Sequence, residues 1–113
     1  MGYYYNFTGE TKFNRPLTQE ELDEFNHLYP YQNIEVCSNY LSVYNETKIC
    51  DIRPILIQLS NEFFKPRNIY FNGRLDYNGE EFDDVGYYDI DSKNNTFNHY
   101  IGKIKIEYTL SNY

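Results

Sequence analysis

Apolar and polar residues alternate with a period of two in four stretches of the chain, 3–13, 69–77, 85–91 and 97–108. Successive side chains of a strand point to opposite faces of a sheet, so this pattern predicts four strands, each with one buried face. Residues 34–44 are also rich in β-branched and aromatic side chains, and they predict either one interrupted strand or two short ones.

Two other stretches follow the helical period. The first predicted helix starts after Thr18, which forms a capping box with Glu21, and it stops at Tyr29 because Pro30 disfavours a helical residue before it. Its predicted buried stripe consists of Leu22, Phe25, Leu28 and Tyr29.

The second helix is predicted over residues 52–64, where apolar residues recur at spacings of three and four. Asp51 is its predicted N-cap, and Pro54 falls in the first turn, where a missing N–H does little harm. This helix is the more apolar of the two, so we expect it to lie across the sheet.

The predicted element order is β-α-β-α-β-β-β, and the 113 residues are expected to form a single domain, 1–113. Short links rich in Asn, Gly and Asp join the last three strands, which predicts an antiparallel meander. Asn78-Gly79 is typical of a tight hairpin turn, and Gly9 is expected to mark a bulge. We therefore predict an α+β fold with an antiparallel sheet and two helices packed on one face.

The net charge of −7 comes from 17 acidic and 10 basic residues. It disfavours nucleic-acid binding and adhesion to anionic membranes, both of which use clusters of Lys and Arg. It is compatible with a basic protein partner, and also with a charge that serves solubility alone. The start lacks the features of a signal peptide, so we expect a cytoplasmic protein in which Cys37 and Cys50 are reduced.

Candidate catalytic and metal-binding patterns are incomplete. Asp76, Asn78 and Glu80 alternate as the ligands of a calcium loop do, but the sixth and twelfth positions of the loop are Glu and Tyr rather than Gly and Glu. A carboxylate pair in a polar hairpin lacks the desolvation that raises a catalytic pKa. His27 and His99 have no neighbours at ligand spacing, and His99 is expected at a partly buried strand position. We therefore predict no catalytic residue, no metal site and no cofactor.

The segment DYNGEEFDD, residues 76–84, holds five carboxylates in nine positions. Two more follow in the next predicted strand, aromatic residues lie between them, and residues 76–91 contain no Lys or Arg. Carboxylates can replace phosphates and aromatic rings can occupy base pockets, so such a surface suits a nucleic-acid mimic. The predicted partner-binding residues are Asp76, Glu80, Glu81, Asp83, Asp84, Tyr87, Tyr88, Asp89 and Asp91.

In its size, its acidic charge and its mixture of acidic and aromatic residues, the chain resembles two groups of proteins. One is the immunity proteins that block nuclease toxins, and the other is the phage-encoded inhibitors of bacterial defence. Three motifs, MGYYYNFTGE, PLTQEE and FNGRLDYNGEEFDD, resemble a family of small bacterial proteins. That family has an MGY start, a Pro-Leu-Thr helix start and a late Gly-Glu-Glu. The family resemblance supports the fold prediction and implies no activity.

We therefore expect a small, acidic, non-enzymatic binding protein. It would occlude a basic, nucleic-acid-binding site on a partner protein, such as a nuclease toxin or a phage-defence effector. Two alternatives stay open. One is a ligand-binding or hydrolytic domain with a Tyr-lined pocket between the second helix and the sheet. The other is a structural subunit that self-assembles through an exposed strand edge.

Overall fold

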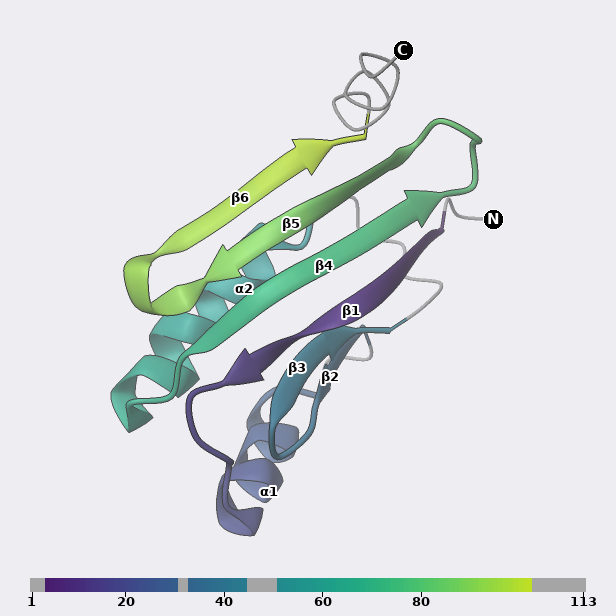
Figure 1. Cartoon of the computed structure of the whole chain (residues 1–113). Coiled ribbons are helices and arrows are strands. Elements are labelled where there is room, and N and C mark those ends of the chain that lie inside the picture. Colours follow the sequence, from purple (N-terminus) through teal and green to yellow (C-terminus); the bar gives the residue numbers. More distant parts are fainter. Residues whose placement is uncertain (1–3, 31–32, 45–50, 103–113) are drawn as a thin grey trace.

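The computed structural model describes residues 4–30, 33–44 and 51–102. Six strands form one antiparallel sheet in the order β2-β3-β1-β4-β5-β6, and two helices pack on one of its faces (Figure 1). The predicted α+β fold is thereby confirmed. The strands are β1 (Tyr5–Phe13), β2 (Ile34–Val36), β3 (Tyr40–Val43), β4 (Phe71–Gly79), β5 (Val85–Asp91) and β6 (Thr96–Ile101), and the helices are α1 (Gln19–Leu28) and α2 (Arg53–Leu59).

The sheet places the first strand in the middle, because β1 pairs with both β3 and β4. Residues 34–44 form two short strands, the second of the two possibilities that the sequence left open. The meander of β4, β5 and β6 is confirmed as antiparallel. The predicted continuation of the last strand from 103 to 108 lies outside the described residues.

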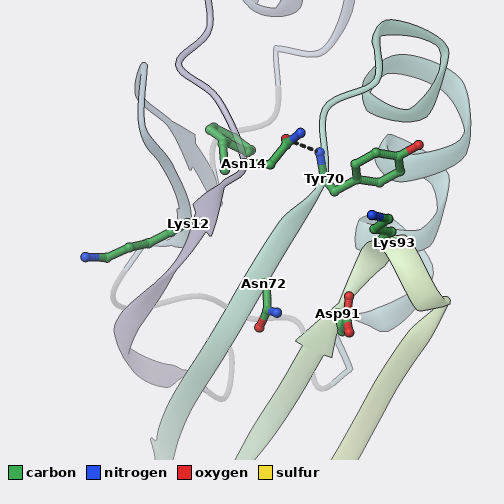
Figure 2. A pocket seen from close by; sticks show the side chains of 7 residues that line it. Lys12, Asn14, Tyr70, Asn72, Asp91 and Lys93 are labelled. Carbon is green, nitrogen blue, oxygen red and sulfur yellow. Dashed lines mark hydrogen bonds between the residues drawn. The ribbon is translucent and has the colours of Figure 1, made fainter.

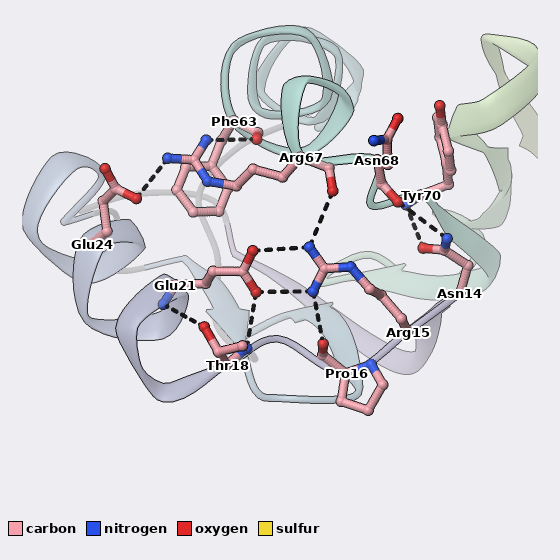
Figure 3. A network of polar contacts seen from close by, with 10 residues as sticks. All are labelled: Asn14, Arg15, Pro16, Thr18, Glu21, Glu24, Phe63, Arg67, Asn68 and Tyr70. Atoms are coloured by element: carbon pink, nitrogen blue, oxygen red, sulfur yellow. Dashed lines mark hydrogen bonds and ion pairs between the residues drawn. The ribbon is translucent and has the colours of Figure 1, made fainter.

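The capping box of α1 is confirmed. Its Glu21 carboxylate also binds Arg15, and Arg15 connects α1 to Arg67 at the end of the second helical segment (Figure 3). Glu21 accepts the Thr18 N–H at 2.9 Å and two hydrogen bonds from the Arg15 guanidinium at 2.9 and 3.0 Å. Arg15 also donates to the carbonyl of Arg67, whose own guanidinium pairs with Glu24 at 2.6 Å. The Arg15 guanidinium lowers the pKa of Glu21 to about 2.

The buried stripe of α1 is shorter than predicted. Phe25 is buried, and Leu22 and Tyr29 are partly buried, but 53% of Leu28 is exposed, so its predicted place in the stripe is wrong. The chain leaves the helical conformation at Tyr29, whose ring centroid lies 5.3 Å from that of Phe25. The stripe therefore ends on Tyr29.

The second helix changes pitch as it crosses the sheet. After α2 come a π-helical turn, Ser60–Phe64, and a 3₁₀ turn, Lys65–Arg67. Within the wider turn the consecutive side chains Phe63 and Phe64 are both fully buried. Asp51 lies one residue before the observed N-cap, and its carboxylate accepts the Arg53 N–H at 3.0 Å. The predicted cap is therefore displaced by one position, although the carboxylate still satisfies a free N–H of the first turn.

Gly9 does not form the predicted bulge, because β1 and β4 remain paired residue for residue through Gly9 and Leu75. The requirement for glycine is nevertheless real. Its φ is +92°, and a Cβ there would lie 2.7 Å from the carbonyl oxygen of Arg74. Glycine alone fits this close approach of the two strands.

The core lies between the helices and one face of the sheet. Leu56, Leu59 and Phe63 fill the space under the second helix, and all three are fully buried. They meet Leu75 and Tyr88 of the sheet in one continuous cluster. A Tyr-lined pocket between the second helix and the sheet stays a prediction.

Candidate partner-binding surface

The sheet face opposite the helices carries polar and tyrosine side chains in cross-strand rows, and we call it the open face. Side chains paired in register point to the same face of a sheet. Because Phe71, Leu75 and Tyr77 point into the core, the alternating residues of β4 lie on the open face. Three rows follow from the register: Thr8, Asp76, Tyr87 and Tyr100; Glu10, Arg74, Asp89 and Asn98; and Lys12, Asn72, Asp91 and Thr96.

Arg74 occupies the centre of this face. Its guanidinium lies 3.8 Å from the ring centroid of Tyr87 and forms an ion pair with Asp76 at 3.0 Å. Asp89 is its cross-strand neighbour on β5, and the ring of Tyr87 stacks on that of Tyr100 at 4.8 Å. The acidic segment contains no Lys or Arg in sequence, but the fold brings Arg74 among its carboxylates. The open face is therefore of mixed charge.

The connection between β4 and β5 contains a run of acidic residues with no Lys or Arg among them. We call residues 80–84 the tip; four of these five residues are acidic. The Gly79 N–H donates to the Asp84 carbonyl at 2.6 Å, and the Asp84 N–H donates to the Glu81 carbonyl at 3.1 Å. The Glu80 carboxylate accepts the N–H of Tyr4 at 2.5 Å. These contacts hold the tip in a defined turn.

The predicted tight turn at Asn78-Gly79 is wrong. Both residues belong to β4, and neither has a positive φ. Asn78 pairs with Val85 of β5 and with Asn6 of β1, while Gly79 pairs with Tyr5. Pairing with β1 on the far side of β4 extends the strand through the dipeptide and moves the turn to the tip.

Phe82 lies in the middle of the tip, and 99% of its side chain is exposed. It is the second residue of the turn closed between Glu81 and Asp84. Burying a phenylalanine side chain is worth about 1.5–3 kcal/mol, which this position does not gain within the chain. The tip therefore presents an apolar ring surrounded by carboxylates.

Tyr88 is the one predicted partner-binding residue that the structure places inside the core. It is fully buried, and its ring stacks on that of His99 at 4.4 Å. Adjacent strand residues point to opposite faces, so only one of Tyr87 and Tyr88 can lie on the open face. Asp76, Tyr87, Asp89 and Asp91 share that face, and Glu80, Glu81, Asp83 and Asp84 lie in the tip. A partner-binding role for these eight residues stays a prediction.

His99 is partly buried, as predicted, and it joins an aromatic cluster on the core side. Its Nε2 lies 2.7 Å from the hydroxyl of Tyr77. Burial lowers the pKa of His99, while the Asp51 carboxylate opposes this effect. Burial likewise raises the pKa values of Tyr77 and Tyr88. These shifts favour a neutral cluster, which fits a packing role.

A cavity of about 360 Å³ lies at the other end of the open face, near the start of β4 (Figure 2). We call it the pocket. Its lining combines Phe13 with polar residues from the end of β1, the start of β4, the end of β5 and the residues next to these strand ends, which are far apart in sequence. These polar residues are Lys12, Asn14, Tyr70, Asn72, Asp91 and Lys93. No local motif signals this site, because only strand pairing brings its residues together.

Hydrogen bonds brace one wall of the pocket. The Asn14 side chain accepts the Tyr70 N–H at 2.8 Å and donates to the carbonyl of Asn68 at 3.2 Å. Lys93 Nζ lies 5.9 Å from the centroid of the Tyr70 ring. Asp91 accepts a hydrogen bond from Asn94 at 2.7 Å. The pocket is thus a preformed, partly aromatic site with two ammonium groups and one carboxylate.

Within residues 4–30, 33–44 and 51–102, no three His, Cys, Asp or Glu side chains gather as a metal site requires. No helix in this part of the chain has both the length and the apolar character needed to cross a bilayer. Cys37 is a half-buried free thiol, and Cys50 lies outside the described residues.

No protein-family model matches this chain, and no curated protein or solved structure matches it either.

Proposed function

We propose that this protein is a non-enzymatic binding protein that docks its tip and open face on a basic site of another protein. The observation that carries the proposal is the full exposure of Phe82 between the carboxylates of the tip. A partner site with an apolar pocket and a rim of Lys and Arg would bury the ring and pair with the acids. The proposed partner is thus a protein with that combination of groups.

A nucleic-acid-binding groove has both features. It places Lys and Arg for phosphates and apolar or aromatic surface for bases. On the tip, Glu81 and Asp83 would take the place of phosphates and Phe82 the place of a base. A nuclease toxin or a defence effector that acts on nucleic acid is therefore the partner class that this surface fits best, and occupation of its groove would inhibit it.

The two parts of the surface would act differently in the encounter. The tip carboxylates attract a basic site over a distance, which accelerates association. Phe82 is expected to slow dissociation, because a ring buried in a desolvated pocket is the type of contact that dominates interface energies. Tyr87, Tyr100 and Asp89 would form a second contact zone on the open face.

Charge reversal at the tip tests the electrostatic part. The partner is first isolated from source cells by pull-down and identified by mass spectrometry. We then expect Glu81→Lys with Asp83→Lys to slow association with it and to weaken the salt dependence of the rate. Stopped-flow fluorescence at several salt concentrations gives both quantities.

The matched control is Glu20→Lys with Asp23→Lys, at two exposed positions of α1. Both double variants change the net charge by the same amount, so only the location of the charge differs. Equal association rates for the two double variants would mean that the tip is not the docking site.

Replacement of Phe82 tests the apolar part. Phe82→Ala should leave association almost unchanged and speed dissociation about 10- to 100-fold, since burial of the ring is worth about 1.5–3 kcal/mol. Surface plasmon resonance separates the two rates. Leu28→Ala, which removes another exposed apolar side chain, is the control, and a dissociation rate as fast as that of Phe82→Ala would contradict the proposal.

A further inference from the structure

The two ends of the β4–β5 hairpin carry complementary groups. At one end, the tip presents Phe82 and four carboxylates. At the other end, the pocket is lined by Lys12 and Lys93, and the Lys93 ammonium lies beside the ring of Tyr70. We propose that the pocket of one copy of this protein receives the tip of a second copy, so that copies associate head to tail.

The charges of the two surfaces favour this contact. Among the described residues, neither Lys12 nor Lys93 forms an ion pair. Asp91 is the one acidic residue in the pocket lining, and it already accepts a hydrogen bond from Asn94. Figure 2 shows Lys12 on the side of β1 and Lys93 beside Tyr70, so the two ammonium groups lie apart. Carboxylates on both sides of an incoming Phe82 could each reach one of them.

The size and rigidity of the pocket also suit the tip. At about 360 Å³ it lies at the lower end of the range for small-ligand sites, which suits a single aromatic side chain with an adjacent carboxylate. Tyr70 offers a ring contact to Phe82. Asn14 braces the Tyr70 backbone, so little ordering is needed when the tip enters.

The contact has to form between copies. The pocket contains Asn72, near the start of β4, whereas the tip follows the end of the same nine-residue strand. A strand rises about 3.3 Å per residue, so the two ends lie about 30 Å apart and a hairpin cannot reach its own pocket. Because the two surfaces differ, each contact leaves one tip and one pocket free, and the assembly is a ring or an open chain.

Self-association would hide the tip that the proposed function leaves for a partner. The copies would therefore compete with that partner, and dilution would release free tips. The inference stands independently of the proposed function, because it concerns only the complementarity of two surfaces of this chain.

Two variants and their mixture test the inference in the full-length protein. Phe82→Ala disables the tip and keeps the pocket, whereas Lys12→Glu with Lys93→Glu disables the pocket and keeps the tip. By analytical ultracentrifugation at up to about 1 mM protein, the wild type should sediment as species larger than a dimer. Each variant alone should remain a monomer, with association weakened about tenfold or more. An equimolar mixture of the two should give a 1:1 dimer and nothing larger.

A second measurement locates the contact. When the isotopically labelled Phe82→Ala protein is mixed with the unlabelled pocket variant, amide shifts should change at Asn72 and Tyr70 and not at its own residues 80–84. All three substituted positions are exposed, and thermal unfolding confirms that the variants are folded. A wild-type protein that is monomeric at all concentrations, or a mixture that stays monomeric, would overturn the inference while leaving the partner experiments unaffected.

Discussion

Neighbouring residues in this protein have different roles because the backbone sends them to opposite faces. Tyr87 lies on the open face under the Arg74 guanidinium, whereas Tyr88 is fully buried against His99. Their side chains are identical, so composition cannot distinguish them. Similarly, Phe63 and Phe64 are both buried because a wide helical turn carries them, which a regular helical period does not predict.

Gly9 provides a test at the scale of one residue. Gly9→Ala should lower the free energy of unfolding by about 1–3 kcal/mol, because the residue has a positive φ and an added Cβ would meet the Arg74 carbonyl. Urea unfolding followed by circular dichroism gives this value. Asn98→Ala, an exposed position of β6, serves as the control and should change it by no more than about 0.5 kcal/mol. A Gly9 variant as stable as this control would show that the strand pair can move apart at little cost.

At the scale of elements, local signals and long-range contacts coincide in α1 and diverge in the hairpin. The capping box forms as predicted because its two residues lie three apart on one chain segment. The Asn78-Gly79 turn does not form because pairing with β1 keeps both residues in β4. Only the second case depends on a strand that is distant in sequence.

The capping box also predicts how stability depends on pH. The pKa of Glu21 in the folded protein is about 2, lowered by Arg15, whereas an unfolded Glu titrates near its ordinary pKa of about 4.3. Between these values the unfolded chain binds more protons, so the stability from Glu21 is complete above about pH 4.3 and is lost as the pH falls towards 2. The stability difference between the wild type and Glu21→Gln should therefore shrink over this range in urea unfolding experiments.

Glu20→Gln removes a charge from the same helical turn and serves as the control for that experiment. A wild-type advantage over Glu21→Gln that persists unchanged at pH 2 would mean that the Arg15 ion pair does not contribute to stability. Arg15 also donates to the Arg67 carbonyl and so links the start of α1 to the end of the second helical segment. The stabilisation that comes from the Glu21–Arg15 pair therefore extends beyond α1 itself.

At the scale of the whole molecule, the distribution of charge matters more than the net charge of −7. The open face places Arg74 among carboxylates, the tip concentrates four acids around Phe82, and the pocket holds two lysines at the opposite end. Salt bridges on such exposed surfaces add little to stability.

The sequence by itself determined the periods of the strands and helices, the capping of α1 and the number of faces that each strand buries. These features depend on residues within one or two turns or along one strand. The sequence also identified most of the acidic residues of the candidate surface, but it wrongly assigned the buried Tyr88 to the same surface.

The tertiary structure alone decided which tyrosine is exposed, where the hairpin turns, that Arg74 lies opposite Asp89 and that a pocket exists. The reason is physical: each of these outcomes depends on which strands pair and which face the helices cover. Strand pairing and helix packing are set by the burial of the whole core, and no single segment contains that information.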